Sequence, residues 1–324
     1  MKLLDKLLMP SFLWIQVEIS SFCNAECFYC PHTIYRKTWK NRNLSLHEFK
    51  KIVPFLEKTK LLYLQGWGEP FCNPSFFDFV EIGKKKGCKI GTTTNAMLIE
   101  ASHLEKIIEL EMDFISFSLT GIKTNDLLRK GTSIKKVLKI IESLNVLKDK
   151  KGVKKPQINI AYMLLKSNFN EIDNITEEFK NKGIEQVVIS LLDFIPEISI
   201  KSESLVPQTE KEFIKLRDKL LETVQRGEEK GLSVSFNLSH PNRIRHTCSE
   251  KPLNAIFINC LGNVSPCVFT GIPAKEPTTL CFGNINSDSL LKIWRSTAYK
   301  NFRGKHSSEN KPYVCKDCPK IRIS

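Results

Sequence analysis

The sequence Leu13-Trp-Ile-Gln-Val-Glu-Ile19 is followed, three residues later, by Cys23-Asn-Ala-Glu-Cys27-Phe-Tyr-Cys30. The first segment is rich in apolar and β-branched residues and predicts a strand. The second places three thiols within eight residues of a loop, and thiols this close together predict a metal site. A closed zinc site takes four ligands, and His32 is able to complete such a set. Three thiolates in one loop equally suit a [4Fe–4S] cluster with one open iron, so the spacing favours neither centre.

Strand and helix patterns alternate along the first 192 residues. This alternation predicts an α/β fold with a parallel sheet and right-handed crossovers. An open six-unit barrel and a doubly wound sheet both fit it, and in both folds ligands bind at the carboxyl ends of the strands. The predicted strands span residues 13–19, 61–65, 89–94, 114–119, 158–164 and 186–192. The predicted helices span residues 45–58 (with a kink at Pro54), 75–86, 101–110, 134–147 and 171–182.

The composition excludes several classes of protein. The chain has 324 residues, of which 41% are hydrophobic and 26% charged, with 15 Gly and 15 Pro. These values exclude collagen-like, coiled-coil and disordered chains, and no run approaches the roughly 18 apolar residues that a membrane helix needs. Residues 1–14 carry charges among the leucines and no small-residue cleavage site, so we expect no secretory signal and a cytoplasmic protein.

Lys and Arg exceed Asp and Glu by 49 to 35, which gives a formal net charge of +14. Such a surplus is compatible with a nucleic-acid partner. Most of it is lysine on predicted helix faces and in loops, as in residues 148–155, and these segments lack the interleaved aromatic residues of a single-strand binding groove. We therefore expect a solvated basic surface and no nucleic-acid partner.

The first cysteine group, Cys-x3-Cys-x2-Cys with the aromatic Tyr29 before its last cysteine, resembles the signature of the radical S-adenosylmethionine (SAM) superfamily. Four later segments resemble motifs of that family in the same order, with Trp67 standing where the Gly-Gly-Glu-Pro motif has its first Gly. The segments are Gly66-Trp67-Gly68-Glu69-Pro70, Thr94-Asn95-Ala96, Ser116-Phe-Ser118-Leu-Thr-Gly121 and Arg129-Lys-Gly131. The resemblance covers about residues 13–192.

This resemblance implies a partial (β/α)6 barrel of the radical SAM type. It also implies that Cys23, Cys27 and Cys30 hold a [4Fe–4S] cluster whose open iron chelates the amino and carboxylate groups of SAM. In this family, one electron from the reduced cluster breaks a carbon–sulfur bond of SAM and releases a 5′-deoxyadenosyl radical. The protein then positions the cofactors and keeps water out.

The resemblance further implies a set of contacts to SAM. The backbone at Gly66 and Gly68 is able to approach a ligand because no Cβ intervenes, and Glu69 or nearby carbonyls would accept from the methionine ammonium. A tight turn before Pro70 accounts for the same residues without a ligand. The expected contacts are Tyr29 at the adenine, Gly66, Gly68 and Glu69, and Asn95 and Ser118 at the ribose or carboxylate. Structural roles, as a buried ring and as polar strand-end groups, are the alternative for Tyr29 and the last two residues.

Six of the eleven cysteines lie in the last quarter of the chain, where the sequence resembles the SPASM/Twitch extension that binds auxiliary [4Fe–4S] clusters. The resemblance rests on Gly262-x4-Cys267 downstream of Cys248, on Gly283-Asn-Ile, on Leu290-Leu-Lys-Ile-Trp294, on Phe302-Arg303 and on a closing Cys-x2-Cys. The long Cys-x2-Cys-x5-Cys-x3-Cys run of the full pattern is absent, so one auxiliary cluster is expected. Its expected ligands are Cys248, Cys267, Cys315 and Cys318.

Alternatives to this ligand set stay open. Cys281 is the stronger substitute, whereas Cys260 is expected to be a small buried strand residue. A zinc ribbon with four thiolates has the same spacing, and only the motifs in the first half of the chain favour iron–sulfur.

The resemblance predicts a radical SAM oxidoreductase. The radical would abstract hydrogen from a substrate, and the auxiliary cluster would accept the electron of the substrate radical. A tail with one cluster resembles dehydrogenases that oxidise an aminocyclitol alcohol, and a maturase that modifies a peptide or protein is the alternative. A non-catalytic zinc- or nucleic-acid-binding protein is the alternative from a different class.

The expected partners are a small-molecule or peptide substrate and a low-potential electron donor such as flavodoxin or ferredoxin, with no membrane. Arg129, Lys130 and Glu185 are candidates for a general base by chain position alone, and we expect surface charges there, so no catalytic residue is assigned. The expected domains are residues 1–205, the radical SAM core, 206–240, a helical connector, and 241–324, a small α+β SPASM/Twitch-like auxiliary cluster domain. The elements predicted after Asp193 are helices over 209–230 and 290–302 and strands over 233–237, 255–260 and 264–268.

Overall fold

The computed structural model describes residues 9–243, 248–275, 279–308 and 310–321. The chain divides into two compact units, each built from segments that are far apart in the sequence. Unit 1 comprises Met1–Cys23, Tyr35–Thr92 and His246–Lys316, and unit 2 comprises Asn24–Ile34, Thr93–Arg245 and Asp317–Ser324. Within the described ranges, no helix is long and apolar enough to cross a membrane.

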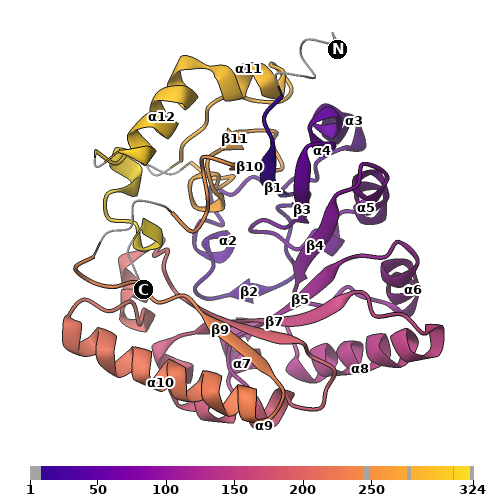
Figure 1. Cartoon of the computed structure of the whole chain (residues 1–324), viewed down its shortest axis with the longest axis vertical. Coiled ribbons are helices and arrows are strands. Elements are labelled where there is room, and N and C mark those ends of the chain that lie inside the picture. Colours follow the sequence, from indigo (N-terminus) through magenta and orange to yellow (C-terminus); the bar gives the residue numbers. More distant parts are fainter. Residues whose placement is uncertain (1–8, 244–247, 276–278, 309, 322–324) are drawn as a thin grey trace. The chain divides into compact units, whose positions relative to one another are not determined.

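The strands of unit 1 lie in the order β11 (Val264–Ser265), β10 (Ala255–Ile258), β1 (Phe12–Val17), β3 (Thr59–Leu64) and β4 (Lys89–Thr94) (Figure 1). β10 comes from the last quarter of the chain, yet it pairs parallel with β1, with Trp14 opposite Ala255. All four residues of β10 are buried, as expected for an apolar strand inside a parallel sheet. β11 is antiparallel to β10 and spans only part of the strand predicted there.

The helices of unit 1 are α3 (Leu46–Lys50), α4 (Val53–Leu56), α5 (Phe76–Lys85), α11 (Leu290–Arg295) and α12 (Thr297–Ser307). Ser45 caps α3 with a full capping box, and the chain restarts as α4 with Pro54 in its first turn. The helix predicted around Pro54 is therefore two helices. The predicted C-terminal helix is also two, because Ser296 ends α11 and caps α12.

The strands of unit 2 lie in the order β5 (Phe114–Leu119), β7 (Gln157–Leu164), β8 (Gln186–Leu191) and β9 (Ser233–Phe236). All of them run parallel. Buried and half-buried residues alternate along β5 and β8, which is the period of a strand with one face in the core. A separate antiparallel pair joins β2 (Glu26–Cys27) to β6 (Arg129–Lys130).

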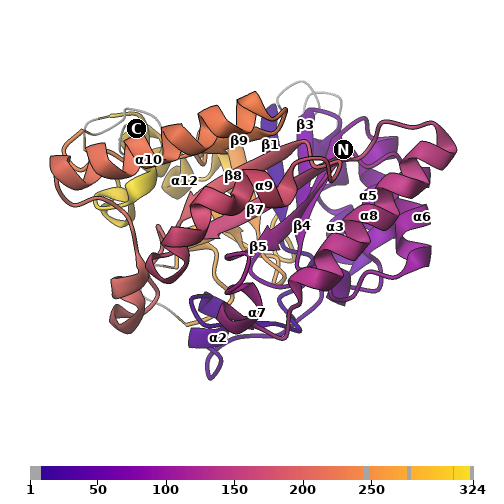
Figure 2. The ribbon, with the colours of Figure 1, turned by 90° about the horizontal axis from the view of Figure 1, so that it is seen from below.

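The helices of unit 2 are α2 (Pro31–Ile34), α6 (Ala101–Glu109), α7 (Asn125–Leu128), α8 (Ile134–Lys151), α9 (Ile175–Phe179) and α10 (Glu210–Glu229). α8 begins after its cap Ser133 and ends at Gly152, which takes a left-handed conformation. Figure 2 shows α2 and α7 at one end of this unit, beyond the carboxyl ends of β5 and β7. These two short helices therefore lie at the end of the strands where the sequence predicts ligand binding.

One predicted helix is wrong in its extent. Of the span predicted as residues 171–182, only Ile175–Phe179 is α-helical, and it follows a 3₁₀ segment over Lys166–Asn174. The side chain of Asn168 accepts from the backbone N–H of Leu165 and donates to a neighbouring carbonyl. Such local hydrogen bonds compete with the α-helical ladder.

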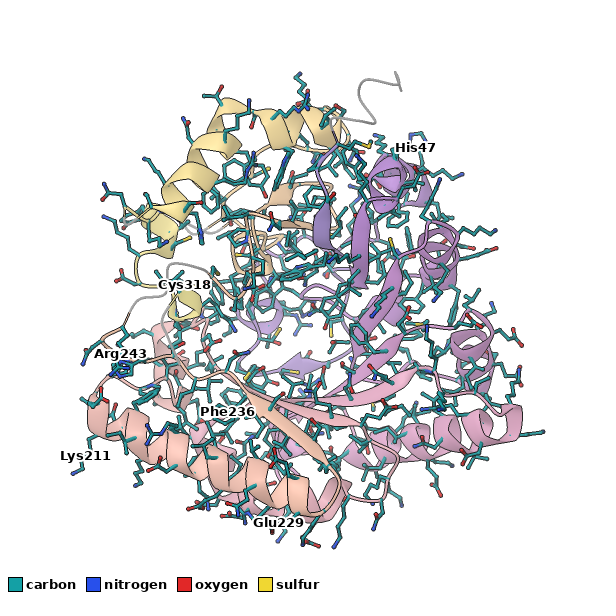
Figure 3. All side chains as sticks on the ribbon, viewed as in Figure 1. His47, Lys211, Glu229, Phe236, Arg243 and Cys318 are labelled. Atoms are coloured by element: carbon teal, nitrogen blue, oxygen red, sulfur yellow. The ribbon has the colours of Figure 1, made fainter. Side chains whose placement is uncertain are left out.

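Charged side chains line the outer side of α10. Lys211 and Glu229 are exposed and point away from the strands (Figure 3). Phe213 and Leu220 lie on the opposite, buried side of the same helix, which is the arrangement of an amphipathic surface helix. His47 on α3 is also exposed, as expected for a helix-surface residue.

Candidate functional site

A short antiparallel pair supports the cysteine loop in unit 2. Cys27 of β2 lies opposite Arg129 of β6. Gly131, which follows this strand, has φ 86°, and a Cβ there would lie 2.9 Å from the carbonyl oxygen of Asn24. The conformation and the close approach both require Gly. The Arg129-Lys-Gly131 motif therefore holds the loop through its backbone.

Tyr29 belongs to a buried polar network. Its hydroxyl lies 2.6 Å from Thr120 Oγ1 and accepts a hydrogen bond from Arg129 Nη1 at 3.0 Å. Burial raises the pKa of Tyr29 to about 12, although the charge of Arg129 opposes this rise, so the phenol stays protonated near neutral pH. Arg129 was expected at the surface but is 8% exposed, whereas Lys130 is exposed. A buried guanidinium therefore lies beside the strand that carries Cys27.

Asn95 and Ser118 have different surroundings. Asn95 is buried after β4, where its Nδ2 donates to Asn24 Oδ1 at 2.9 Å and its Oδ1 accepts from the backbone N–H of Met97 at 2.9 Å. The next residue, Ala96, has φ 67°, a left-handed conformation that favours Gly. Ser118 is half-buried on β5. The structure thus brings Asn95 against the cysteine loop and gives it structural partners as well.

The turn after β5 is shaped by Glu171, a carboxylate that sequence reasoning missed. It accepts hydrogen bonds from the backbone N–H groups of Ile122, Lys123 and Thr124. Partial burial acts to raise the pKa of Glu171, but these bonds outweigh burial and lower it. At Gly121, which has φ 90°, a Cβ would lie 2.1 Å from Thr124 Oγ1. Glu171 and Gly121 together define the turn that follows Ser118-Leu-Thr.

Gly66 and Gly68 lie in unit 1 against the segment that leads to the first cysteine. A Cβ at Gly66 would lie 2.4 Å from the Cβ of Glu18, and a Cβ at Gly68 would lie 2.3 Å from the carbonyl oxygen of Ser20. Neither position has room for a side chain, so both glycines are required by close packing of the two segments.

Glu69 continues this close packing. It is 3% exposed, and its backbone N–H donates to the carbonyl oxygen of Phe22 at 2.7 Å. Its carboxylate accepts from the backbone N–H of Phe71 at 3.2 Å and so caps the 3₁₀ segment Pro70–Cys72. The loop is therefore fixed to the residue that precedes Cys23.

Glu18 is a fully buried carboxylate that joins three segments of unit 1. One oxygen accepts from the backbone N–H of Trp67 at 2.9 Å, and the other accepts from that of Cys260 at 3.2 Å. Burial raises the pKa of Glu18 to about 7 against the opposing effect of these bonds. Sequence reasoning missed this residue. The sequence does carry a signal for it. Glu18 lies two residues beyond Gln16, so the two polar side chains fall on the same face of a predicted strand that is otherwise apolar.

Trp67 links the same loop to the second cysteine group. Its Nε1 donates to the carbonyl oxygen of Val268 at 3.0 Å, and its ring packs edge to face with Phe269 at 6.0 Å. Val268 begins a 3₁₀ turn whose N-terminal cap is Cys267. A tryptophan at this position therefore contacts the turn of a predicted auxiliary ligand.

The predicted auxiliary ligands differ in burial. Cys248 is buried, and the other three, Cys267, Cys315 and Cys318, are half-buried. Burial, with further contributions from Glu250 and Cys248, raises the pKa of the Cys267 thiol, although its hydrogen bonds with Thr270 oppose the rise. A thiol in such a site ionises when a metal cation binds it.

Cys318 belongs to unit 2, where the residues after it are held in place. Ser239 Oγ donates to the carbonyl oxygen of Pro319 at 2.6 Å, and Lys320 forms an ion pair with Asp193 at 2.6 Å. These bonds hold the residues that follow Cys318 within unit 2.

The two alternative cysteines have contrasting positions. Cys260 is fully buried, and burial, with Glu18 nearby, raises its pKa. Cys281 is exposed, and its thiol donates to the carbonyl oxygen of Gly283 at 3.2 Å. Of the two, Cys281 is the one that is open to solvent.

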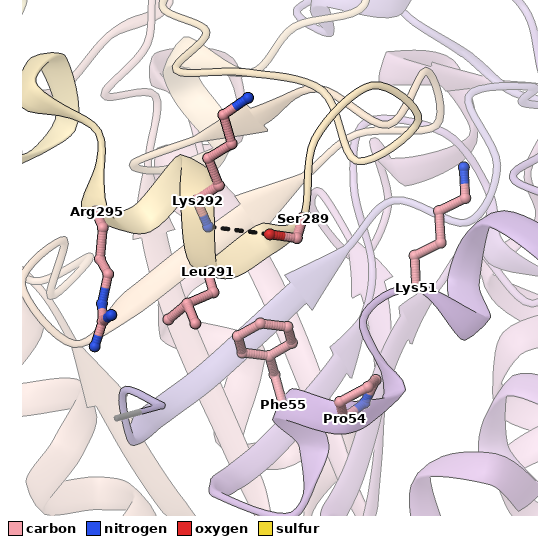
Figure 4. A pocket seen from close by; sticks show the side chains of 7 residues that line it. All are labelled: Lys51, Pro54, Phe55, Ser289, Leu291, Lys292 and Arg295. Carbon is pink, nitrogen blue, oxygen red and sulfur yellow. Dashed lines mark hydrogen bonds between the residues drawn. The ribbon is translucent and has the colours of Figure 1, made fainter. Parts of the chain in front are cut away.

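A pocket of about 450 Å³ in unit 1 contains none of the predicted site residues (Figure 4). Lys51 and Lys292 stand at its rim, where they bond to Asn286 and Asp288. The lining residues are Lys51, Pro54, Phe55, Ser289, Leu291, Lys292 and Arg295. The two lysines at the rim of the pocket are therefore already bonded to other side chains of unit 1.

The family model described as the radical SAM superfamily matches residues 17–178, which is half of the chain. The chain belongs to the radical SAM superfamily. A second model, described as an iron–sulfur cluster-binding domain and named SPASM, matches residues 248–319. The predicted fold class, an α/β fold of the radical SAM type with a C-terminal iron–sulfur domain, is confirmed.

Two curated relatives align along almost the whole chain of this radical SAM protein. One is the tungsten-containing aldehyde ferredoxin oxidoreductase cofactor-modifying protein of Pyrococcus furiosus, 26% identical over 94% of this chain and 86% of the relative. The other is the Fe-coproporphyrin III synthase of Methanosarcina barkeri, 22% identical over 93% of this chain and 73% of the relative.

Solved structures share the fold. SuiB of Streptococcus suis bound to S-adenosylmethionine has a TM-score of 0.72 at 15% identity. The alignment covers 99% of this chain and 78% of the SuiB chain. Native anSMEcpe with bound AdoMet has a TM-score of 0.66 at 20% identity, and the alignment covers 95% of this chain and 88% of anSMEcpe. At these identities the likeness establishes the fold alone.

The radical SAM domain carries a [4Fe–4S] cluster and binds SAM, and the SPASM domain carries auxiliary iron–sulfur clusters. The donor set of this chain fits these groups, because both cysteine groups supply the soft thiolate ligands that iron–sulfur clusters take. No three Cys, His, Asp or Glu side chains converge as ligands of one single metal ion in the part of the chain that is described. In a four-iron cluster each thiolate binds a different iron. The ligands of such a cluster therefore stand farther apart than the ligands of a single metal ion.

Proposed function

We propose that this radical SAM protein is an oxidoreductase that removes two electrons from a small-molecule substrate. When bound, the first cluster and SAM supply a 5′-deoxyadenosyl radical, which takes a hydrogen atom to give 5′-deoxyadenosine, with methionine as the other product. A single auxiliary [4Fe–4S] cluster held by Cys248, Cys267, Cys315 and Cys318 would accept the second electron from the substrate, and a base or solvent would take the proton. A low-potential donor such as flavodoxin or ferredoxin supplies the electron that cleaves SAM.

The observation that carries this proposal is the presence of two cysteine groups in two matched domains. The radical SAM match includes the three-cysteine loop, and the SPASM match begins at Cys248 and includes Cys315 and Cys318. Three protein ligands leave one iron open for SAM, whereas four ligands close a cluster and suit it to electron transfer. A chain with both kinds of site is equipped to start a substrate radical and to oxidise it.

The residues around the first group have positioning roles in this proposal. Cys23, Cys27 and Cys30 hold the first cluster. The backbone of Gly66 and Gly68 would contact SAM, and the buried charge of Arg129 adds a positive field beside the loop, which would favour binding of an anionic group. The auxiliary ligands are Cys248, Cys267, Cys315 and Cys318.

The Pyrococcus furiosus relative, which aligns along almost the whole chain, supports a small-molecule substrate. That protein is named for modifying the cofactor of an oxidoreductase, and a cofactor is a small molecule. A peptide or protein substrate is the second candidate, since solved structures of SuiB and anSMEcpe include complexes with peptides. Their identity to this chain is below the level at which function follows from fold.

Anaerobic purification followed by iron and sulfide analysis tests the cofactors. Two clusters predict about eight irons per chain, and a single cluster predicts about four. With dithionite and SAM, the protein is expected to release 5′-deoxyadenosine, and Cys27→Ala is expected to abolish that release. Cys88→Ala is the matched control, because Cys88 is a buried cysteine outside both groups. A colourless protein that contains zinc and leaves SAM intact would refute the proposal.

A second assay separates the substrate classes. An anaerobic cell extract is added to the reduced protein, and the increase in 5′-deoxyadenosine release is measured before and after protease treatment of the extract. Stimulation that survives protease supports a small molecule. Stimulation that protease removes supports the peptide candidate instead.

A further inference from the structure

The buried face of α12 carries polar atoms whose hydrogen bonds are unsatisfied. Among the described residues, Tyr299 Oη, Arg303 Nη1 and both ring nitrogens of His306 have no hydrogen-bond partner. Tyr299 is 0% exposed and His306 is 1% exposed. Buried polar groups in native proteins are nearly always paired, so these atoms indicate a group that completes the site.

Tyr299 lies within electrostatic reach of the Cys267 thiol. Burial is the main cause that raises the pKa of Tyr299, the charge of Arg303 opposes it, and Cys267 raises it further. The phenol is therefore a permanent O–H donor at neutral pH. The Tyr299 hydroxyl has no hydrogen-bond partner among the described residues, the Cys267 thiol included.

Aromatic packing fixes the ring of Tyr299. Phe282 stacks on it at 4.1 Å with the planes 12° apart, and Trp294 packs edge to face at 5.0 Å. A ring clamped in this way has little freedom to turn its hydroxyl toward another partner. The unsatisfied donor is thus a built feature of this part of unit 1.

Arg303 brings a positive charge to the same place. Its guanidinium lies 3.7 Å from the ring centre of Trp294 and 4.7 Å from that of Tyr299. Its Nη2 donates to the carbonyl oxygen of Trp294 at 2.8 Å, while Nη1 has no partner in the described part of the chain. One end of the guanidinium is therefore anchored and the other is available to an anionic group.

We propose that Tyr299 donates a hydrogen bond to the auxiliary cluster held at Cys267, and that Arg303 supplies positive charge beside it. The inference rests on the proposed function, in which Cys267 is a cluster ligand. A [4Fe–4S] cluster with four thiolates is an anion, and one-electron reduction adds a further negative charge. Hydrogen bonds to its sulfurs and a nearby cation stabilise the reduced form, so they raise the reduction potential. Tyr299 and Arg303 are then positioning residues that make this cluster a better electron acceptor.

The test is a redox titration of the auxiliary cluster, followed by electron paramagnetic resonance. It is done in the full chain with Cys27→Ala, so that the first cluster does not contribute to the signal. Tyr299→Phe is expected to shift the midpoint potential to a more negative value and to change the spectrum. Tyr313→Phe is the matched control, because it removes the same hydroxyl two residues from Cys315 at a side chain that is 88% exposed, and it is expected to leave the potential unchanged.

Arg303 provides an independent variant if Tyr299→Phe fails to fold. Arg303→Gln is expected to lower the potential, and Arg303→Lys, which keeps the charge, is expected to lower it less. Unchanged potentials in Tyr299→Phe, or equal potentials in the two Arg303 variants, at full iron content would overturn the inference and leave the proposed function intact. Absence of any auxiliary cluster in the unmodified protein would instead refute the proposed function.

Discussion

Replacement of Glu18 by Gln is expected to remove a pH dependence of stability. Burial raises the pKa of Glu18 from an ordinary value of 4.5 to about 7 in the folded protein. The shift of about 2.5 units corresponds to about 3 kcal/mol at about 1.36 kcal/mol per unit. Because the pKa of the folded state lies above that of the unfolded state, the contribution of Glu18 is fully present below pH 4.5 and is lost as the pH rises through 7.

The size of the effect depends on the range that is measured. Between pH values of about 5.5 and 8, ionisation of the buried carboxyl is expected to lower the free energy of unfolding by about 2 kcal/mol. In Glu18→Gln this part of the pH dependence disappears. The amide also loses one of the two hydrogen bonds that the carboxyl accepts from Trp67 and Cys260, at a cost of about 1–3 kcal/mol that does not vary with pH.

Urea unfolding followed by tryptophan fluorescence, under anaerobic conditions at several pH values, measures both terms. The quantity of interest is the difference between the two pH profiles, so the constant cost of the lost hydrogen bond cancels. Glu81→Gln is the control, because Glu81 is an exposed helix carboxylate in an ion pair with Lys85. Parallel profiles for the original protein and Glu18→Gln would show that Glu18 does not titrate near neutral pH, and the reasoning from its burial would be refuted.

Four further substitutions follow, three in the loops around the site and one, Gly304→Ala, in α12. Gly68→Ala would place a Cβ 2.3 Å from the carbonyl oxygen of Ser20, so it is expected to cost about 1–3 kcal/mol of stability in urea unfolding and to weaken SAM binding in equilibrium dialysis. A Cβ at Gly304 would meet no atom within 4 Å, so Gly304→Ala is expected to stabilise α12 by about 0.5–1 kcal/mol. A loss of stability equal to that of Gly68→Ala would contradict the packing argument. Ala96→Gly relieves a residue with φ 67° and is expected to raise stability by up to about 1 kcal/mol in the same assay, with a decrease showing that the conformation carries no strain. Glu171→Gln weakens the cap on the turn after β5, so proteolysis of that turn is expected to become faster above pH 5, where the original carboxylate is ionised, and equal rates would exclude a role for its charge.

Several features of the fold and site were predictable because they arise from short-range chemistry. The strands at β1, β3, β4, β5, β7 and β8 follow from runs of apolar and β-branched residues. The division of the first predicted helix follows from Pro54, whose ring and missing N–H disrupt a helix wherever they occur. The first cysteine group was evident because three thiols in one loop predict a shared site, and the second was evident from its resemblance to the SPASM/Twitch extension.

Other predictions failed or fell short where distant residues decide the environment. Arg129 was expected at the surface, but its pairing with Tyr29, one hundred positions earlier, places its charge inside unit 2. The helix predicted across Glu171 is shorter than expected, and the Glu171 carboxylate bonds to a turn 47 to 49 positions earlier in the chain. No pattern of apolar and polar residues in the sequence predicts either of these two contacts.

The amino-acid order alone determined the cysteine ligand types, the strand-helix alternation and the glycines at the tight loops, since each depends on neighbours within a few positions. Tertiary structure decided that β10 pairs with β1, that Glu18 meets Cys260 and that Trp67 meets Val268. These pairs are separated by about two hundred residues or more, and they form because apolar strands and buried polar groups must find partners when water is excluded. Burial requires that each such strand or polar group has a partner, but only the packed fold decides which residue that partner is.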